Sequence, residues 1–317
     1  MRRRATFLVI VIAIAAWVLG SALGSLDGAV TAHAQSAGVV VGKAHAGYTP
    51  SLTGSKPVVI LAIGSGARPG ENVLRSLGDS LHLIFLNPQS KRAVLVGVPR
   101  DSYLPIPGRG TGKINSSMVY GGPDLLVQTM EQNFGVTIDY WALTTFWGFT
   151  DMINAVGGLT VDVPFPMIDS FARTDFSPGV QKLTGPEALA FSRDRHSLEE
   201  GDFGRQENGG RLFLAALAQF KTQFRVDQAR LFTWLGAGMR NIDTEMPLSE
   251  IMALAFTATK VPTTRVQNVV LPGSAGLVGG LSVVTLDMAR SRAIVADAKK
   301  DALLFKKNVP PSPTANE

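Results

Sequence analysis

The segment PVVILAIGSG, residues 57–66, joins a continuous apolar run to a glycine-rich turn. An apolar run without alternating polar residues is typical of a strand that is buried on both faces of a sheet. Two more strands are expected over 81–86 and 93–98, on either side of the turn Asn87-Pro88-Gln89-Ser90. The sequence therefore predicts that a buried sheet begins near residue 57.

Strands and helices alternate through the rest of the chain. Further strands are expected over 139–144, 159–163 and 266–271, and helices over 123–134, 146–156, 186–192, 204–224, 228–239, 248–258 and 285–304. This alternation predicts an α/β fold, with a central mixed β-sheet flanked by helices on both faces. Neither an internal repeat nor a second linker interrupts it, so one domain is expected over 57–305.

The composition excludes several classes of protein. Hydrophobic residues make up 45% of the 317 residues and charged residues 17%, which excludes a disordered chain. The absence of cysteine excludes disulfides, thiolate zinc sites and cysteine nucleophiles. A formal net charge of +5 is too small to indicate a nucleic-acid partner. The dinucleotide, phosphate-loop and serine-hydrolase motifs are each incomplete or absent.

The N-terminus predicts a membrane anchor. Three arginines, residues 2–4, precede an apolar stretch that reaches about Leu23, long enough to span a bilayer core. We expect a basic stub and transmembrane helix over 1–24, a flexible linker over 25–56, and the domain on the outer side of the membrane. A cleaved signal peptide ending at Ala34 is the alternative. The last residues, 306–317, are expected to be disordered.

Arginine residues stand where strands and helices are expected to end or begin. Arg193 and Arg195 lie two apart on an extended segment, so their side chains point the same way. Arg205 opens a long helix, where backbone N–H groups already favour an anion. With Arg100, which follows the third strand, these side chains suit a pyrophosphate. In the alternative that stays open, each arginine pairs with a neighbouring acid, for which the candidates are Asp101, Asp194 and Asp202.

Several longer motifs occur in one order along the chain. They are GVPRDSY (97–103), KIN (113–115), YGGP (120–123), ALAFSRDRH (188–196) and GDFGRQ (201–206). In these motifs the sequence resembles the LytR-CpsA-Psr family of cell-wall enzymes. The resemblance covers about residues 57–225, with weaker agreement to 305.

The resemblance implies a phosphotransferase anchored in the cell membrane by a single span. Such an enzyme takes a glycan polymer from a polyprenyl-pyrophosphate carrier and joins it to peptidoglycan through a phosphodiester. The family's pyrophosphate-binding arginines correspond to Arg100, Arg193, Arg195 and Arg205. The further substrate-binding candidates are Arg75, Lys113, Asp101 and Gln206. The implied partners are the lipid-linked glycan, the peptidoglycan acceptor and the cytoplasmic membrane.

The resemblance also implies Mg²⁺ (or Mn²⁺) held by two aspartates. Asp79 corresponds to one of them, but Gly66 stands at the place of the other, and Gly209 replaces a family glutamine. One carboxylate together with pyrophosphate oxygens would hold the ion weakly. The missing carboxylate keeps two alternatives open, a non-catalytic module that binds lipid-linked glycan and a polyprenyl-pyrophosphate hydrolase.

Overall fold

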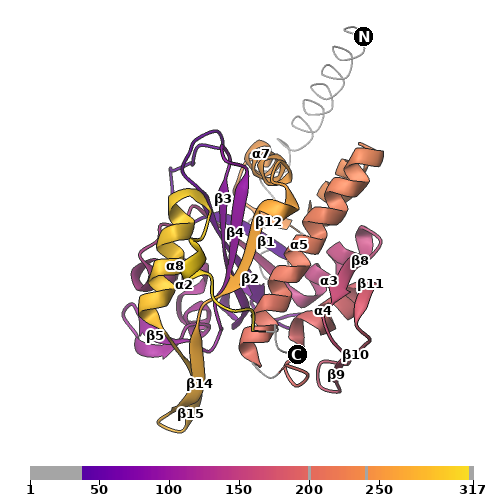
Figure 1. Ribbon diagram of the computed structural model, residues 1–317. Helices are drawn as coiled ribbons and strands as arrows, with labels where there is room; N and C mark the ends of the chain where they lie inside the picture. The colour runs from indigo at the N-terminus through magenta and orange to yellow at the C-terminus, as the bar shows by residue number, and fades with distance from the viewer. Residues whose placement is uncertain (1–37, 199–200, 240–241, 314–317) are drawn as a thin grey trace.

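The computed structural model of the chain describes residues 38–198, 201–239 and 242–313. A seven-stranded sheet lies at its centre (Figure 1). In spatial order its strands are β12 (Ile242–Thr244), β1 (Val39–Lys43), β7 (Tyr140–Thr145), β2 (Val58–Ser65), β3 (Gly78–Asn87), β4 (Arg92–Gly97) and β13 (Val266–Val270). The pairs β1–β12, β2–β7 and β4–β13 are parallel and the others antiparallel, so the predicted mixed α/β sheet is confirmed.

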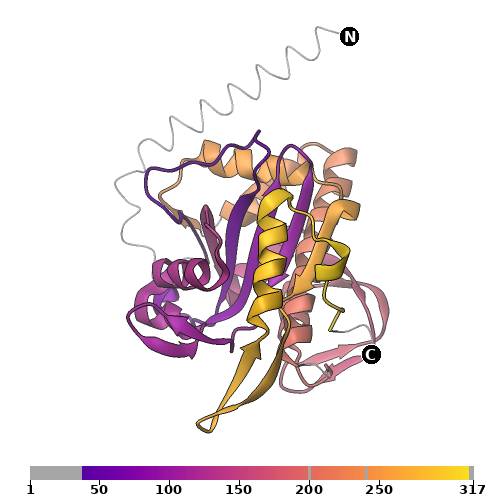
Figure 2. The same cartoon turned by 60° about the vertical axis from the view of Figure 1, so that its left-hand side comes forward.

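Helices cover both faces of this sheet. Helices α2 (Ser116–Phe134) and α8 (Met288–Asp301) pack on the face that carries Leu61, Leu83 and Val96. The other face meets α5 (Asp202–Val226) and α7 (Leu248–Thr259), as the views in Figures 1 and 2 show. Because successive strand residues point to opposite faces, Leu83 meets the α2 and α8 side while His82 contacts α5.

A smaller apolar cluster lies beside α5 and supports the remaining helices. Helices α3 (Phe146–Ala155) and α4 (Gly185–Arg193) contribute to it, and α6 (Arg230–Met239) contacts α3 and α5. Three of the short strand pairs are β5 (Tyr103–Ile106) with β6 (Gly110–Lys113), β8 (Leu159–Val163) with β11 (Gly179–Leu183), and β9 (Met167–Asp169) with β10 (Thr174–Phe176). Leu212 of α5 packs with Phe191 of α4 and Val161 of β8 in this cluster. The core under α5 therefore fixes where α4 ends and where the segment after it begins.

Helix α5 lies unusually close to the sheet because glycine stands at the crossing points. A Cβ atom added at Gly97 would lie 3.0 Å from Gln206 Cβ. One added at Gly210 would stand directly against the amide group of Asn268. The Asn268 amide donates to the Glu207 carbonyl at 3.0 Å, so the contact is polar as well as tight.

The structure corrects two of the predicted boundaries. Residues 39–43 lie inside the predicted linker but form β1, since their valines pair with β7 and Val40 is buried. The predicted helix 285–304 begins only at Met288, because Asp287 caps α8 by accepting from the Arg290 N–H. The residues before it form the hairpin of β14 (Gly273–Val278) and β15 (Leu281–Leu286), whose β-branched run favours a strand.

The predicted disordered tail is also partly wrong. Residues 306–308 form a 3₁₀ turn, as do 73–75 and 263–265. The Asn308 amide donates to Asp297 at 2.6 Å, and the Ser312 hydroxyl donates to Glu207. These polar contacts hold the chain up to residue 313 against the domain.

The predicted anchor over residues 1–24 lies outside the described residues. Within 38–198, 201–239 and 242–313, no helix is both long enough and apolar enough to cross a membrane.

We expect Gly210→Ala to destabilise the fold. The new methyl group would force the Asn268 amide to rotate or α5 to rise from the sheet, at a cost of about 1–3 kcal/mol in the free energy of unfolding. Gly236→Ala in α6 is the matched control, because nothing lies within 4 Å of a Cβ there. In a helix interior alanine is more stable than glycine by roughly 0.5–1 kcal/mol. Denaturant unfolding measures the free energy of unfolding of both variants. If the two substitutions change it in the same direction, this account is wrong.

Candidate functional site

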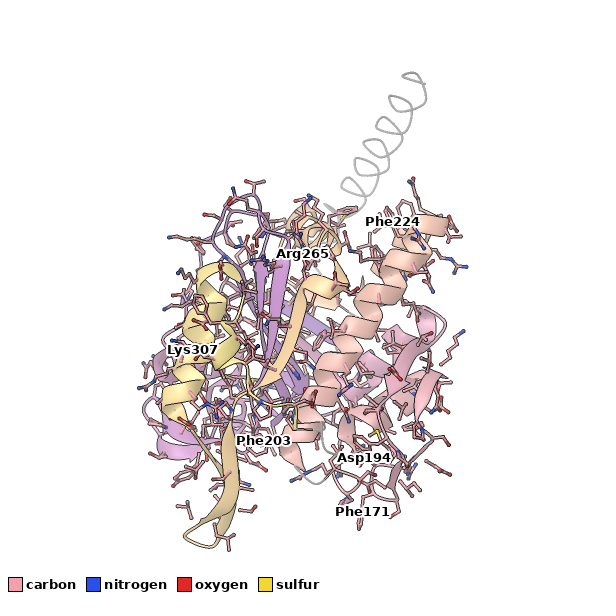
Figure 3. All side chains as sticks on the ribbon, in the orientation of Figure 1. Phe171, Asp194, Phe203, Phe224, Arg265 and Lys307 are labelled. Atoms are coloured by element: carbon pink, nitrogen blue, oxygen red, sulfur yellow. The ribbon has the colours of Figure 1, made fainter. Side chains whose placement is uncertain are left out.

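Four arginines and two aspartates are among the residues that line a cavity of about 200 Å³ near the start of β3 and the start of α5. Residues from six segments form this arginine pocket: Asp79, Ser80, Arg100, Phe146, Asp169, Phe171, Ala172, Ser192, Arg193, Arg195, His196 and Arg205. Figure 3 places Phe171, Asp194 and Phe203 together at this end of the molecule. The structure thus brings five of the predicted site residues into one cavity, Arg100, Arg193, Arg195, Arg205 and Asp79.

Arg205 forms the buried floor of the pocket. Its side chain is 7% exposed, and Nη2 donates to Asp202 Oδ1 at 2.5 Å. Burial lowers the pKa of Arg205, and the Asp202 carboxylate opposes that effect. The other Asp202 oxygen accepts the Arg100 N–H at 3.1 Å, so one carboxylate joins α5 to the end of β4.

Arg100 is held by a different carboxylate. Its Nη1 pairs with Asp79 Oδ1 across the pocket. Burial by itself lowers the pKa of Arg100, but the charges of Asp79, Asp101 and Asp202 raise it above the usual value. The Nε atoms of Arg100 and Arg205 are buried without a hydrogen-bond partner among the described residues. Two guanidinium donors beside the cavity therefore have unused hydrogen-bonding capacity.

Arg193 and Arg195 differ from the other two arginines. Neither forms an ion pair with any acid in the described part of the chain. Asp194 lies between them but turns away, accepting from the Thr174 hydroxyl at 2.7 Å and the Ser197 N–H at 3.1 Å. The Arg193 guanidinium lies 5.0 Å from the centre of the Phe146 ring. The salt-bridge alternative therefore holds for Arg205, which pairs with the candidate acid Asp202. Arg100 is also paired, but with Asp79, which was not among the candidate acids. The alternative does not describe Arg193 or Arg195.

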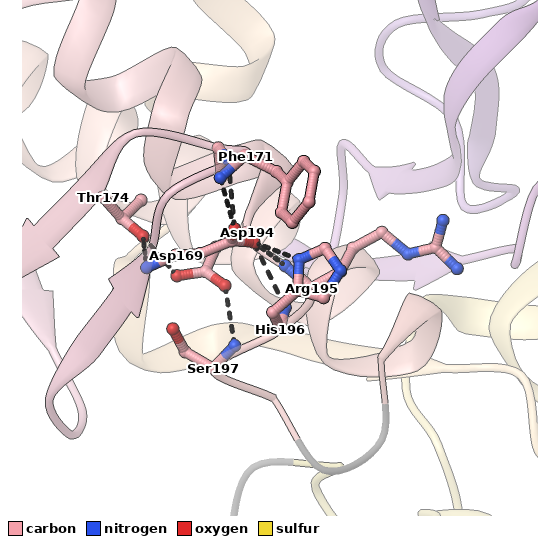
Figure 4. Close-up of polar contacts among 8 residues, drawn as sticks. Asp169, Phe171, Thr174, Asp194, Arg195, His196 and Ser197 are labelled. Atoms are coloured by element: carbon pink, nitrogen blue, oxygen red, sulfur yellow. Dashed lines mark hydrogen bonds and ion pairs between the residues drawn. The ribbon is translucent and has the colours of Figure 1, made fainter.

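The sequence analysis missed a buried carboxylate beside these arginines, that of Asp169 (Figure 4). One of its oxygens accepts backbone N–H groups of Phe171 and Ala172, and the other accepts those of Arg195 and His196. The same oxygen bonds His196 Nδ1 at 2.8 Å. Burial alone would raise the pKa of Asp169, but these hydrogen bonds hold it well below its usual range. No local pattern links residues 26 positions apart, so only the fold reveals this contact.

The remaining predicted residues lie outside the arginine pocket. Arg75 is exposed and donates to the Tyr120 carbonyl at 3.0 Å. Lys113 pairs with Asp101 at 3.2 Å. Gln206 is buried on the sheet side of α5, with no hydrogen-bond partner for its amide among the described residues. Asp101 instead lines a second cavity.

The second cavity, of about 430 Å³, opens beside the arginine pocket. Its lining includes Asp101, Asp202, Phe203 and residues of the β14–β15 hairpin. Arg195 lines both cavities, so the two spaces meet at its side chain.

The predicted metal position contains one carboxylate. A Cβ atom added at Gly66 would stand directly against Asp79 Oδ2, so position 66 does face Asp79. The described residues contain no group of three or more side chains able to hold a metal ion. Since Asp79 already pairs with Arg100, the protein alone offers a poor magnesium site, and substrate oxygens would have to complete it.

His82 occupies the space beside Gly209. A Cβ atom added at Gly209 would lie 2.7 Å from His82 Cε1, so a larger side chain there would collide with the imidazole. His82 Nε2 donates to the Gln206 carbonyl at 2.9 Å, and Ser80 of the pocket lies 3.4 Å from Nδ1. Burial lowers the pKa of His82 to about 4, and the charge of Arg205 adds to this effect.

Comparison with known proteins gives this pocket a family context. The LytR_cpsA_psr family model matches residues 29–300, which include the whole pocket and part of the predicted linker. The polyisoprenyl-teichoic acid–peptidoglycan teichoic acid transferase TagV of Bacillus subtilis (strain 168) is 32% identical over 223 residues, 66% of this chain and 56% of that protein. TagU of Bacillus mycoides (strain KBAB4), with the same transferase name, is 42% identical over 159 residues, 50% of this chain and 51% of that protein. The chain therefore spans about half the length of the curated relatives it matches.

Solved structures agree with the fold. The crystal structure of B. subtilis TagV aligns with a TM-score of 0.66 at 28% identity, over 79% of this chain and 99% of that chain. A structure of TagT bound to LI-WTA aligns with a TM-score of 0.65 over 82% of this chain and 95% of that chain. Its identity is 22%, so that likeness concerns the fold alone.

We expect the buried His82 to make stability depend on pH. In the folded protein this imidazole stays neutral down to about pH 4, because burial holds its pKa there. In the unfolded chain it takes up a proton near pH 6.5. The unfolded state thus binds more protons in this window, and the free energy of unfolding falls as the pH drops, by up to about 3 kcal/mol. His82→Gln keeps an N–H donor but should lose this part of the pH dependence in denaturant unfolding. If the free energy of unfolding changes with pH in the same way in both proteins, His82 is not the source of this pH dependence.

Proposed function

The chain belongs to the LytR-CpsA-Psr family, and we propose that it transfers a glycan polymer from a polyprenyl-pyrophosphate carrier to peptidoglycan. The observation that carries the proposal is the arginine pocket, in which Arg193 and Arg195 have no acidic partner among the described residues. Guanidinium groups grip phosphate oxygens in two places, so this pocket suits a pyrophosphate group. The names of TagV and TagU, which pair a polyisoprenyl-linked polymer with peptidoglycan, support the choice of substrates.

The reaction we propose exchanges one phosphorus–oxygen bond for another. A sugar hydroxyl of the acceptor attacks the phosphorus that carries the glycan. The bond from that phosphorus to the bridging oxygen breaks, and polyprenyl phosphate leaves. Negative charge spreads over the phosphoryl oxygens in the transition state, and positive groups held in place stabilise it.

The four arginines fall into two pairs with different roles in this reaction. Asp79 and Asp202 hold Arg100 and Arg205 in place, so both guanidinium groups are positioned before a phosphate arrives. Arg193 and Arg195 bring the charge that no described carboxylate balances, and it is this charge that a pyrophosphate neutralises.

We place this activity on the outer side of the cytoplasmic membrane, with residues 1–24 as the anchor. The three arginines before the apolar stretch support this orientation. We further propose that Mg²⁺, or Mn²⁺, binds weakly together with the substrate, with Asp79 as the protein ligand. When bound, such an ion neutralises charge on the pyrophosphate oxygens.

Arginine substitutions test the proposed function in the full-length protein with polyprenyl-pyrophosphate oligosaccharide, peptidoglycan acceptor and Mg²⁺. Arg193→Ala and Arg195→Ala should each weaken binding of the lipid pyrophosphate by about tenfold to over a hundredfold, since a charge-assisted contact contributes roughly 1.5–3 kcal/mol. Their unfolding temperatures should stay near that of the natural protein, because no described ion pair is lost. Arg225→Ala, at the exposed far end of α5, is the matched control.

The products separate the proposal from its alternatives. Polyprenyl phosphate released only when acceptor is present, together with glycan-bearing peptidoglycan, supports transfer. Equal release without acceptor would identify a hydrolase. Tight lipid binding without any release would identify a binding module, which the missing carboxylate at Gly66 favours.

Replacing Gly66 tests the metal proposal. Gly66→Asp should raise Mg²⁺ affinity in the presence of a pyrophosphate ligand by about tenfold, because a second carboxylate would face Asp79. Gly66 does not have a positive φ, so aspartate is free of backbone strain there. Gly66→Ala is the control, since it displaces Asp79 to a similar extent without adding a ligand. Titration calorimetry gives the affinities, and equal values for the two variants would refute the metal position.

A further inference from the structure

His196 has a defined hydrogen-bonding arrangement at the rim of the arginine pocket. Its Nδ1 lies 2.8 Å from Asp169 Oδ2, and the Asp169 side chain is only 2% exposed (Figure 4). Because an ionised carboxylate only accepts hydrogen bonds, the proton of the neutral ring must sit on Nδ1. The lone pair of the ring is therefore on Nε2, for which the described residues supply no partner.

The position of the ring is also fixed. Asp169 accepts the His196 N–H at 3.2 Å as well as the ring N–H, so one carboxylate sets both the backbone and the side chain. The Phe171 ring packs against the imidazole, with 4.9 Å between the ring centres. The imidazole itself is 63% exposed and lines the same cavity as the four arginines. An oriented base thus stands beside the proposed pyrophosphate site and remains open to a second substrate.

We propose that His196 is the general base of the transfer reaction and takes the proton of the acceptor sugar hydroxyl at Nε2. The inference rests on the proposed function. As the hydroxyl oxygen bonds to phosphorus, its proton passes to His196 Nε2, the ring becomes an imidazolium paired with Asp169, and solvent later removes the proton. Polyprenyl phosphate departs with the electron pair of the broken bond.

The chemistry of the two oxygens favours a base over an acid at this position. The leaving group is a phosphate, which is stable as an anion and needs no proton. The attacking group is a sugar hydroxyl, a weak nucleophile until its proton is removed. Asp169 stabilises the imidazolium that forms, in the way that a carboxylate supports a histidine base in other enzymes.

Phe171 supplies a surface for the acceptor at the same place. Its side chain is 81% exposed although it is large and apolar, and it lines the pocket next to His196. An exposed aromatic ring offers an apolar face on which a sugar ring can pack. Such packing would leave a hydroxyl of that sugar beside the imidazole.

The test measures transfer turnover and lipid-pyrophosphate binding separately in the full-length protein. His196→Gln should lower turnover by about 10²–10⁴-fold, the usual contribution of a general base, while lipid affinity changes less than about threefold. Added imidazole should partly restore turnover in His196→Ala, because the site is open to solvent. His45→Gln is the matched control, since His45 forms a similar exposed pair with Glu131, whose carboxylate lies at 2.9 Å. Asp169 is left unchanged because four backbone N–H groups depend on it.

Each outcome decides one of the two proposals. Loss of turnover with retained binding and imidazole rescue supports His196 as the base. Turnover of His196→Gln within about threefold of the natural protein would overturn it, as would an equal loss of binding or a lack of rescue. A natural protein that transfers no glycan would overturn the proposed function itself, and the inference with it.

Discussion

Repulsion between guanidinium groups is the constraint around which this end of the molecule is built. Arg100 and Arg205 would repel each other inside a largely buried site, and water is too scarce there to screen them. Each guanidinium has its own carboxylate, since Asp202 pairs with Arg205 and Asp79 pairs with Arg100. Asp202 also accepts the backbone N–H of Arg100 through its other oxygen. Removing one partner of an ion pair buried this deeply strongly destabilises the folded protein, because the other charge stays buried without a partner. Asp202 therefore couples the integrity of α5 to the geometry of the pocket.

The division between paired and unpaired arginines has a functional consequence. The floor is neutralised within the protein, so it is stable without a ligand. The charge of Arg193 and Arg195 is left for an anion. The Asp169 carboxylate accepts the backbone N–H of Arg195 and the ring N–H of His196, so it fixes the Arg195 backbone without pairing with its guanidinium. The fold thus holds Arg195 through its backbone and Arg193 through the Phe146 ring, and it leaves the charge of both side chains available.

The sheet and most helices could be predicted from the sequence because their signals are local. The apolar run before Gly64 and the helix signals around Arg205 each depend on neighbouring residues. Convergence of the arginines followed from their places at element ends, together with the family motifs. Asp169 and His196 carry no such signal, because their contact joins β9 to the segment after α4. The strand β1 was missed for a related reason, since its short valine run forms a strand by pairing with β7, which is distant in the sequence.

The replacement at Gly66 changes the balance of charge around Asp79 more than it changes the shape of the pocket. With a second carboxylate, Asp79 would be repelled by its neighbour and would favour a bound cation. Without it, Asp79 forms an ion pair with Arg100, and that pair balances the charges of both groups. Under the proposed function, an incoming pyrophosphate would compete with Asp79 for Arg100, and the released carboxylate would be free to meet a cation that the substrate carries. The proposed Mg²⁺ or Mn²⁺ would then bind after the substrate, because Arg100 holds the Asp79 carboxylate until the phosphate arrives.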